Sequence, residues 1–391
     1  MEFHSLALSK RAKAMSGPIF ILAGEPSGDQ LAANLMRAVN NSHNSPDWIG
    51  VGGPLMIAEG LKPVAAMDPL TIIGFGKSIL SYRALARYAD TLVNKVETYR
   101  PRFVLTVDAK GFSIRFAQRL RRRMTNASWS VPIVHCVAPT VWAWGGWRTK
   151  KYVRALDGLL CLFPFEPQYF KSLGLNVSFI GHPDAFDVPT RRLTNKSSCE
   201  ARKILLLPGS RREEIKMILP EMLRATQKLL QMRLKLNFYI PTLPQLKTKV
   251  MGMVDGYDVE VVDSKVELSN YLESADAMMA TSGTITLQAA LYGVPGVTCY
   301  RTDNFTAFIG KILVNRDNVI LPNVILGRKV YPFLFQKQLT ADALASSIVD
   351  IINNPDARGD ANSAALDLRL ALTGGKDDFE ILVNNALEKW L

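Results

Sequence analysis

The sequence is poor in the residues that build disulfide frameworks and metal centres. Its 391 residues include only four cysteines and four histidines. No two cysteines form a CxxC pair, and no group of cysteine and histidine has the spacing of a zinc site. The cysteines therefore predict free thiols in a reducing compartment, and the sequence predicts no metal site.

Long apolar runs are also missing. The longest nearly uncharged stretch, residues 277–300, contains glycine, proline and threonine, which predict a strand, a loop and a helix instead of a membrane span. The first residues, MEFHSLALSKRAKAM, lack the apolar segment of a secretory signal. We expect residues 1–17 to form a disordered N-terminal extension, and a mitochondrial transit segment is the alternative.

Acidic residues are too few to balance the basic ones. The chain has 47 lysines and arginines against 35 aspartates and glutamates, a formal charge of +12. Such an excess is typical of proteins that bind nucleic acid, anionic membranes or acidic substrates, and a merely basic surface is the alternative. No nucleic-acid recognition motif is present, so we expect no nucleic-acid partner.

Apolar strands alternate with turns and amphipathic helices through most of the chain, which predicts parallel sheets covered by helices. The alternation restarts after a polar stretch, residues 188–203. We therefore expect an α/β protein with two Rossmann-like, doubly wound domains that face a cleft. The N-terminal domain would span residues 18–190 and the C-terminal domain residues 200–350. Residues 351–391 are typical of helices, for which packing back on the N-terminal domain is one arrangement.

Ligands of open parallel sheets bind at the carboxyl ends of the strands, so the strand-to-helix turns are the places to search. The turn at residues 24–29, GEPSGD, lacks the dinucleotide spacing G-x-G-x-x-G. Its Glu25 could orient sugar hydroxyls, while Ser27 or Asp29 could instead cap the following helix. Asp108 ends an apolar strand, where it could accept a proton from an attacking hydroxyl or cap the next helix.

Two later turns place small residues at the start of a helix, where backbone N–H groups and the helix dipole attract anions. Arginine adds a planar fork that suits phosphate. Two such turns in one domain fit a nucleotide diphosphate better than a single phosphate. The candidate residues are Gly209, Ser210, Arg211, Ser282, Gly283 and Thr284.

A further turn is rich in tryptophan. Trp142, Trp144 and Trp147 lie within six positions and precede Lys150 and Lys151. Aromatic rings beside cations suit sugars, lipid interfaces or single-stranded nucleic acid. An aromatic core beside a solvated basic helix is the alternative.

These turns belong to seven motifs in a specific order. They are G-E-x-S-G-D, P-x-V-W-A-W, F-x-F-E-P, F-I-G-H-P, L-L-P-G-S-R-x-x-E, S-G-T-x-x-L and L-P-N-x-x-x-G-R, spread over residues 18–340. Their order and spacing resemble the lipid-A-disaccharide synthase family. The resemblance implies a GT-B fold and an inverting sugar transfer without metal or other cofactor. The donor would be UDP-2,3-diacylglucosamine, the acceptor 2,3-diacylglucosamine 1-phosphate (lipid X), and the products the β(1→6) disaccharide 1-phosphate and UDP.

The resemblance also implies roles for particular residues. Asp108 would act as general base on the acceptor 6-hydroxyl, with Glu25 and Ser27 near the reacting sugars. Arg211 would offset the charge on departing UDP, and Gln288 and Asn323 would lie near the nucleotide. The chain departs from the family pattern at three positions, where the family commonly has aspartate, asparagine and glutamate: Gly111, Ser113 and Gln288.

Both implied substrates are acylated, and the implied acceptor carries a phosphate. A basic surface without a spanning helix therefore fits peripheral attachment to the cytoplasmic side of an anionic inner membrane. The expected membrane or acceptor contacts are Trp142, Trp144, Arg122 and Lys151, and a solvated helix face is the alternative for each cation. A homodimer is an assembly that the sequence leaves open. The rival functions are a UDP-sugar 2-epimerase and a catalytically impaired nucleotide-binding relative.

Overall fold

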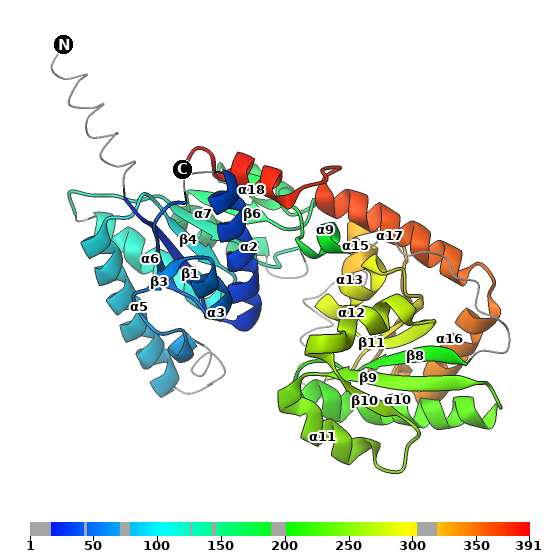
Figure 1. The fold of residues 1–391 in the computed structure, drawn as a ribbon. Helices are drawn as coiled ribbons and strands as arrows, with labels where there is room; N and C mark the ends of the chain where they lie inside the picture. Colours follow the sequence, from blue (N-terminus) through cyan, green and yellow to red (C-terminus); the bar gives the residue numbers. More distant parts are fainter. Residues whose placement is uncertain are drawn as a thin grey trace. The chain divides into compact units, whose positions relative to one another are not determined.

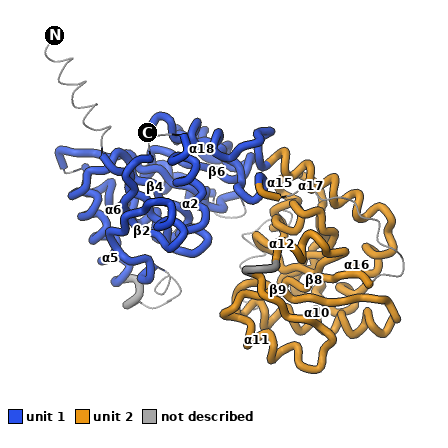
Figure 2. Tube along the Cα trace, viewed as in Figure 1, with its two compact units in different colours: residues 1–186, 372–391 blue, residues 187–371 orange. Residues whose placement is uncertain are grey.

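The computed structural model describes seven stretches of the chain: residues 17–42, 45–70, 79–125, 127–142, 146–188, 201–302 and 319–391. The chain divides into two compact units (Figure 2). Unit 1 comprises residues 1–186 and 372–391, and unit 2 comprises residues 187–371. Most of the expected N-terminal extension, residues 1–16, lies outside the described residues.

Unit 1 contains a seven-stranded sheet in the order β3-β2-β1-β4-β5-β6-β7, with every neighbouring pair parallel. Figure 1 labels β1, β3, β4 and β6 of this sheet. The strands are β1 (Ile19–Ala23), β2 (Trp48–Val51), β3 (Leu61–Pro63), β4 (Val104–Val107), β5 (Ile133–Cys136), β6 (Gly158–Cys161) and β7 (Asn176–Phe179). The helices are α2 (Pro26–Ser42), α3 (Pro54–Ala58), α5 (Ile79–Tyr99), α6 (Lys110–Thr125), α7 (Thr149–Ala155), α8 (Gln168–Lys171), α9 (Asp184–Asp187) and α18 (Phe379–Leu387).

Both faces of this sheet are covered, which explains why its strands are apolar at every position. In β1 all five side chains are buried. Phe20 and Leu22 pack in a core with residues of α5, α6 and α7, whereas Ile19, Ile21 and Ala23 pack in a second core with residues of α2 and α18. Because successive side chains of a strand point to opposite faces, a strand between two helical layers must be apolar throughout.

Unit 2 contains a six-stranded sheet in the order β10-β9-β8-β11-β12-β13, again with every neighbouring pair parallel. Its strands are β8 (Arg202–Leu207), β9 (Leu236–Thr242), β10 (Glu260–Asp263), β11 (Ala277–Thr281), β12 (Gly296–Tyr300) and β13 (Phe333–Phe335). Its helices are α10 (Arg212–Gln231), α11 (Pro244–Val254), α12 (Ser264–Ser274), α13 (Thr284–Leu291), α15 (Leu321–Leu326), α16 (Ala341–Asn353) and α17 (Ala357–Thr373).

The two sheets confirm the predicted pair of doubly wound, Rossmann-like domains. The helices after residue 350 are shared between the units: α17 lies almost wholly in unit 2, while α18 packs against α2 in unit 1 (Figure 1). No helix in the described stretches is long and apolar enough to cross a membrane.

Each sheet has one point where the strand order reverses. In unit 1 it lies between β1 and β4, where Ala23 pairs with Val107. In unit 2 it lies between β8 and β11, where Leu207 pairs with Ala280. The loops that leave these strands at their carboxyl ends enclose the crevice where such folds bind ligands. They contain four of the turns that the sequence singled out.

Candidate active site

Asp108 lies at the reversal point of unit 1, directly after β4. Its backbone N–H donates to the carbonyl of Cys136 on β5 at 3.0 Å, and its own carbonyl accepts from Ser113 Oγ at 2.9 Å. A Cβ placed on Gly28 of α2 would lie 3.8 Å from the Cβ of Asp108, so the first turn of α2 runs close beside it. The half-buried aspartate is therefore fixed at its backbone and flanked by the GEPSGD turn.

The backbone around Asp108 is strained. Asp108 and the alanine after it have φ values of 50° and 46°, and Val137, at the end of the neighbouring strand, has φ of 82°. Residues other than glycine pay roughly 1–3 kcal/mol for such a conformation, and a β-branched residue adopts it rarely. Strained residues cluster at active sites, where the surrounding structure holds them in place. Three of them on adjacent loops therefore mark this edge of the sheet as a candidate active site.

The three acidic or hydroxyl side chains of the GEPSGD turn have different environments. Glu25 and Ser27 are exposed at the start of α2. Asp29 is buried and accepts hydrogen bonds from the backbone N–H groups of Gly53, Leu55 and Met56 at 2.8, 3.1 and 3.2 Å. Asp29 therefore caps α3 instead of the helix on which it lies, and only the other two can face a ligand.

The PGSR turn lies at the reversal point of unit 2. Gly209 has φ of +112°, which glycine adopts without strain, and a Cβ there would lie 2.6 Å from Glu214 Oε2, 3.0 Å from Glu214 Cβ and 3.2 Å from Thr281 Cγ2. Arg211 and Glu214 form a capping box, in which the Glu214 carboxylate accepts from the backbone N–H of Arg211 at 3.4 Å and from its Nη1 at 2.7 Å. The anionic partner of the α10 N-terminus is thus supplied by the chain itself.

The SGT turn before α13, in contrast, has no carboxylate partner from a capping box within the described residues. Its N-cap residue, Gly283, provides no side-chain hydrogen bond, and Gly283 and Thr284 are exposed. Ser282 Oγ donates to the carbonyl of Val319 at 3.2 Å. The Thr281 hydroxyl is buried and has no partner within the described parts of the chain. The two predicted anion seats therefore differ in one respect: at the start of α10 the backbone N–H of Arg211 already has a carboxylate partner, whereas the N-cap residue of α13 provides no side-chain hydrogen bond.

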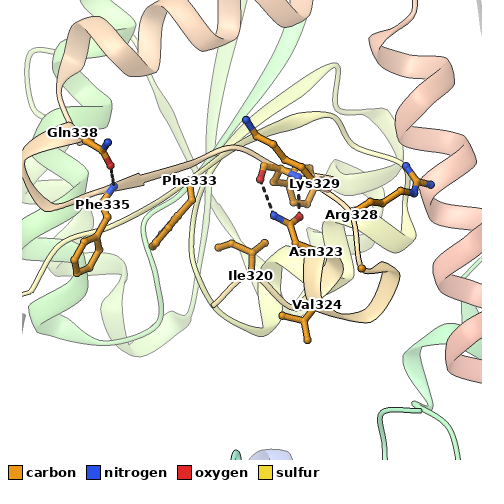
Figure 3. Close-up of a pocket in the computed structure, with 10 residues that line it drawn as sticks. Ile320, Asn323, Val324, Arg328, Lys329, Phe333, Phe335 and Gln338 are labelled. Atoms are coloured by element: carbon orange, nitrogen blue, oxygen red, sulfur yellow. Dashed lines mark hydrogen bonds between the residues drawn. The ribbon is translucent and has the colours of Figure 1, made fainter. Parts of the chain in front are cut away.

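Asn323 on α15 clamps the loop that follows it. Its Oδ1 accepts from the backbone N–H groups of Val330 and Tyr331 at 2.9 and 3.0 Å, and its Nδ2 donates to the carbonyl of Tyr331 at 3.0 Å (Figure 3). The loop forms one wall of a cavity of about 590 Å³ that Phe333 and Phe335 also line. An amide nitrogen carries two hydrogens, so Asn323 can hold this loop and still donate to a ligand.

We expect Asn323→Ala to destabilise unit 2. The change removes three hydrogen bonds to backbone groups, and at roughly 1 kcal/mol each the expected loss is about 2–4 kcal/mol. Thermal unfolding followed by circular dichroism measures it, with Asn237→Ala, a change at an exposed position of β9, as the matched control. An unfolding temperature equal to that of the control would show that the clamp contributes nothing.

The residues predicted to contact a membrane or the acceptor are only partly described. Trp144 lies outside the described residues, and Trp142 is partly exposed after β5. Arg122 on α6 and Lys151 on α7 are exposed. The neighbouring arginines of α6 are paired with acidic residues: Arg119 with Asp90, Arg121 with Asp157, and Arg123 with Glu97. These three arginines are therefore engaged in ion pairs, whereas the roles predicted for Arg122 and Lys151 stay predictions.

Gln288 is partly buried on α13, one turn beyond Thr284. Within the described stretches, no three His, Cys, Asp or Glu side chains are arranged to hold a metal ion. The three described cysteines, Cys136, Cys161 and Cys299, are free and buried. Burial raises the pKa of all three thiols, so they are uncharged at neutral pH.

Comparison with known proteins identifies the family. The family model described as Lipid-A-disaccharide synthetase matches residues 19–373. The chain belongs to this family. The lipid-A-disaccharide synthase of Rhodospirillum centenum is 35% identical over 350 residues, which cover 87% of this chain and 86% of that protein. The lipid-A-disaccharide synthase of Pseudomonas syringae pv. tomato is 33% identical over 377 residues, or 91% of this chain and 97% of that protein.

Solved structures with low sequence identity share the fold. The S. aureus MnaA–UDP structure aligns with a TM-score of 0.63 at 13% identity, covering 95% of this chain and 96% of that one. MurG of Acinetobacter baumannii aligns with a TM-score of 0.57 at 12% identity, covering 95% and 99%. These likenesses confirm the GT-B fold that the motifs imply.

Proposed function

We propose that the protein transfers 2,3-diacylglucosamine from its UDP derivative to the 6-hydroxyl of 2,3-diacylglucosamine 1-phosphate (lipid X). The products are the β(1→6)-linked disaccharide 1-phosphate and UDP. The observation that carries this proposal is the family model, which matches nearly the whole two-unit fold and includes both reversal points.

The donor would bind at the reversal point of unit 2. Its diphosphate would rest on the exposed N-terminus of α13, at Gly283 and Thr284, with Ser282 beside it. Gly209 would lie beside the phosphates on the adjacent loop, and a side chain there would collide with the Glu214 carboxylate. Arg211, whose side chain is 75% exposed, can turn from Glu214 toward the phosphates, with Ser210 next to it. Gln288 and Asn323 complete the proposed set around the nucleotide.

The acceptor would bind at the reversal point of unit 1, beside Asp108. The acceptor oxygen attacks C1 of the donor sugar from the face opposite UDP, and its proton passes to the Asp108 carboxylate. The electron pair of the breaking C1–O bond leaves with UDP, where Arg211 and the α13 dipole stabilise the growing negative charge. One displacement inverts the configuration at C1, and the exposed Glu25 and Ser27 would orient sugar hydroxyls. No metal or other cofactor takes part.

The proposed substrates also indicate the location of the protein in the cell. Both carry acyl chains, so we propose peripheral attachment to the cytoplasmic face of an anionic inner membrane, with Trp142, Trp144, Arg122 and Lys151 in contact with lipid or acceptor. The exposure of the two cations and the formal charge of +12 support this surface.

The reaction is tested by measuring UDP release with and without the acceptor. We expect release that depends on lipid X and persists in excess EDTA, because the proposed site uses no metal. An equal rate of UDP release with and without lipid X, or conversion of a UDP-sugar into its 2-epimer, would contradict the proposed transfer.

A further inference from the structure

Three of the sequence motifs meet at the carboxyl edge of the unit 1 sheet, and of their residues that the structure describes only Trp142 has a contact proposed above, with lipid or acceptor. Trp142 follows β5, Phe163 and Phe165 follow β6, and His182 follows β7. Backbone hydrogen bonds join the successive strand ends, from Asp108 to Cys136, from Val137 to Leu160 and from Ile180 to Cys161. The motif side chains therefore lie on the same sheet edge as Asp108.

The four rings form a continuous set, which we name the aromatic row. Phe163 stacks on Phe165 with centroids 5.7 Å apart and planes 7° apart, and on His182 at 5.8 Å and 17°. Trp142 meets Phe165 edge-on at 5.3 Å and 84°. All four side chains remain partly exposed, whereas Leu162 and Phe170 beside them are buried. The row is thus a surface of rings and not part of the core.

Hydrogen bonds of the buried Glu166 hold the turn that carries Phe163 and Phe165. Glu166, only 2% exposed, accepts a hydrogen bond from the backbone N–H of Phe163 at 3.1 Å. The backbone N–H of Tyr169 donates in turn to the carbonyl of Glu166 at 3.1 Å. These bonds fix the turn after β6, so the two phenylalanine rings are positioned before any ligand arrives.

Two buried nitrogen atoms, one at each end of the row, lack a hydrogen-bond partner in the described parts of the chain. Trp142 Nε1 and His182 Nδ1 are buried and have no hydrogen-bond partner among the residues that the structure describes. The nearest acid to the histidine, Asp184, lies 3.9 Å from Nδ1, beyond hydrogen-bond distance. Buried nitrogens without partners are uncommon, and a bound ligand is one of the few explanations for a pair of them.

The aromatic rings and ring nitrogens of the row indicate the kind of ligand that it would bind. Partly exposed aromatic rings contact the C–H groups of a sugar. The indole N–H at one end of the row donates a hydrogen bond, and the imidazole Nδ1 at the other end donates or accepts one according to its tautomer, which suits the hydroxyl and acyl groups that such a sugar carries. Burial lowers the pKa of His182, although Asp184 opposes this, so the ring is neutral near pH 7. A neutral part of an acylated sugar fits all of these features.

We propose that the aromatic row binds the acylated glucosamine ring of the acceptor and presents its 6-hydroxyl to Asp108. This inference rests on the function proposed above. Adjacent strands lie about 4.8 Å apart, so the row begins one strand from Asp108 and ends three strands away, roughly the span of a substituted sugar.

Phe163→Leu tests the proposal, because it removes the central ring and keeps an apolar side chain of similar size. We expect the KM for the acceptor to rise about five- to ten-fold, with kcat, the KM for the UDP-sugar and the Kd for UDP unchanged. Phe186→Leu is the matched control, since Phe186 contacts Phe379 outside the row. An unchanged acceptor KM, or an equal rise for both substrates, would overturn the proposal.

A second variant, Trp142→Phe, keeps an aromatic ring and removes only the indole N–H. We expect it to raise the acceptor KM about three-fold, as the loss of one neutral hydrogen bond does. If Phe163→Leu fails to fold, an unchanged acceptor KM in Trp142→Phe overturns the proposal by itself. Wild-type protein without acceptor-dependent turnover would instead contradict the proposed function, so the two failures are distinguishable.

Discussion

Replacing Asp108 by asparagine should lower turnover about a thousand-fold and leave the affinity for UDP unchanged. Asparagine has nearly the same shape and keeps the backbone hydrogen bonds to Cys136 and Ser113, but its amide cannot accept the proton of the acceptor hydroxyl. UDP binds at the other unit in our proposal, so its Kd, measured by isothermal titration calorimetry, should equal that of the wild type.

The control for this change is Asp90→Asn, which removes an aspartate of the same unit that pairs with Arg119 at 3.1 Å. Its turnover should match the wild type, because this partly exposed ion pair contributes little to stability and nothing to the proposed chemistry. Turnover of Asp108→Asn within a few-fold of this control would remove Asp108 from the role of base.

Replacing Arg211 by alanine should lower kcat/KM about a hundred-fold and weaken UDP binding. Its guanidinium lies on the turn proposed to hold the diphosphate, where it would stabilise the charge that grows as UDP departs. The structure shows it paired with Glu214 at 2.7 Å while its side chain is 75% exposed, so the pair can exchange for a phosphate without unfolding the helix start. Arg211→Lys should recover only part of the loss, because an ammonium cannot make the two parallel bonds of a guanidinium.

Arg212→Ala is the matched control for this position. Arg212 is the next residue and is also exposed. Its backbone carbonyl, and not its side chain, accepts a hydrogen bond from Lys249 Nζ. We expect its UDP affinity, measured by calorimetry at one fixed ionic strength, to equal that of the wild type. Equal losses in both variants would show that general positive charge, and not the position of Arg211, governs nucleotide binding.

The fold could be predicted from local sequence because its strands lie between two helical layers. A strand such as β1, buried at all five positions, is apolar throughout, and such runs followed by glycine or acidic turns indicate doubly wound parallel sheets. The turns at the reversal points could be predicted for the same reason, since they follow those strands directly.

Contacts between distant residues could not be predicted in this way. Asp29 has the spacing of a cap for its own helix, yet its partners are the backbone N–H groups of Gly53, Leu55 and Met56, which the pairing of β1 with β2 brings near. The return of α18 to α2 likewise depends on tertiary packing. The pairing of Glu214 with Arg211 does have a local signal, because these two residues of the L-L-P-G-S-R-x-x-E motif have the three-residue spacing of a capping box.

The most direct measurement of the central claim is the structure of the product, determined by mass spectrometry and by the anomeric coupling in NMR. Purified protein incubated with UDP-2,3-diacylglucosamine and lipid X should give one UDP for each β(1→6)-linked disaccharide 1-phosphate, as a single displacement at C1 requires. An α-linked disaccharide, or UDP formed without any disaccharide, would contradict the account.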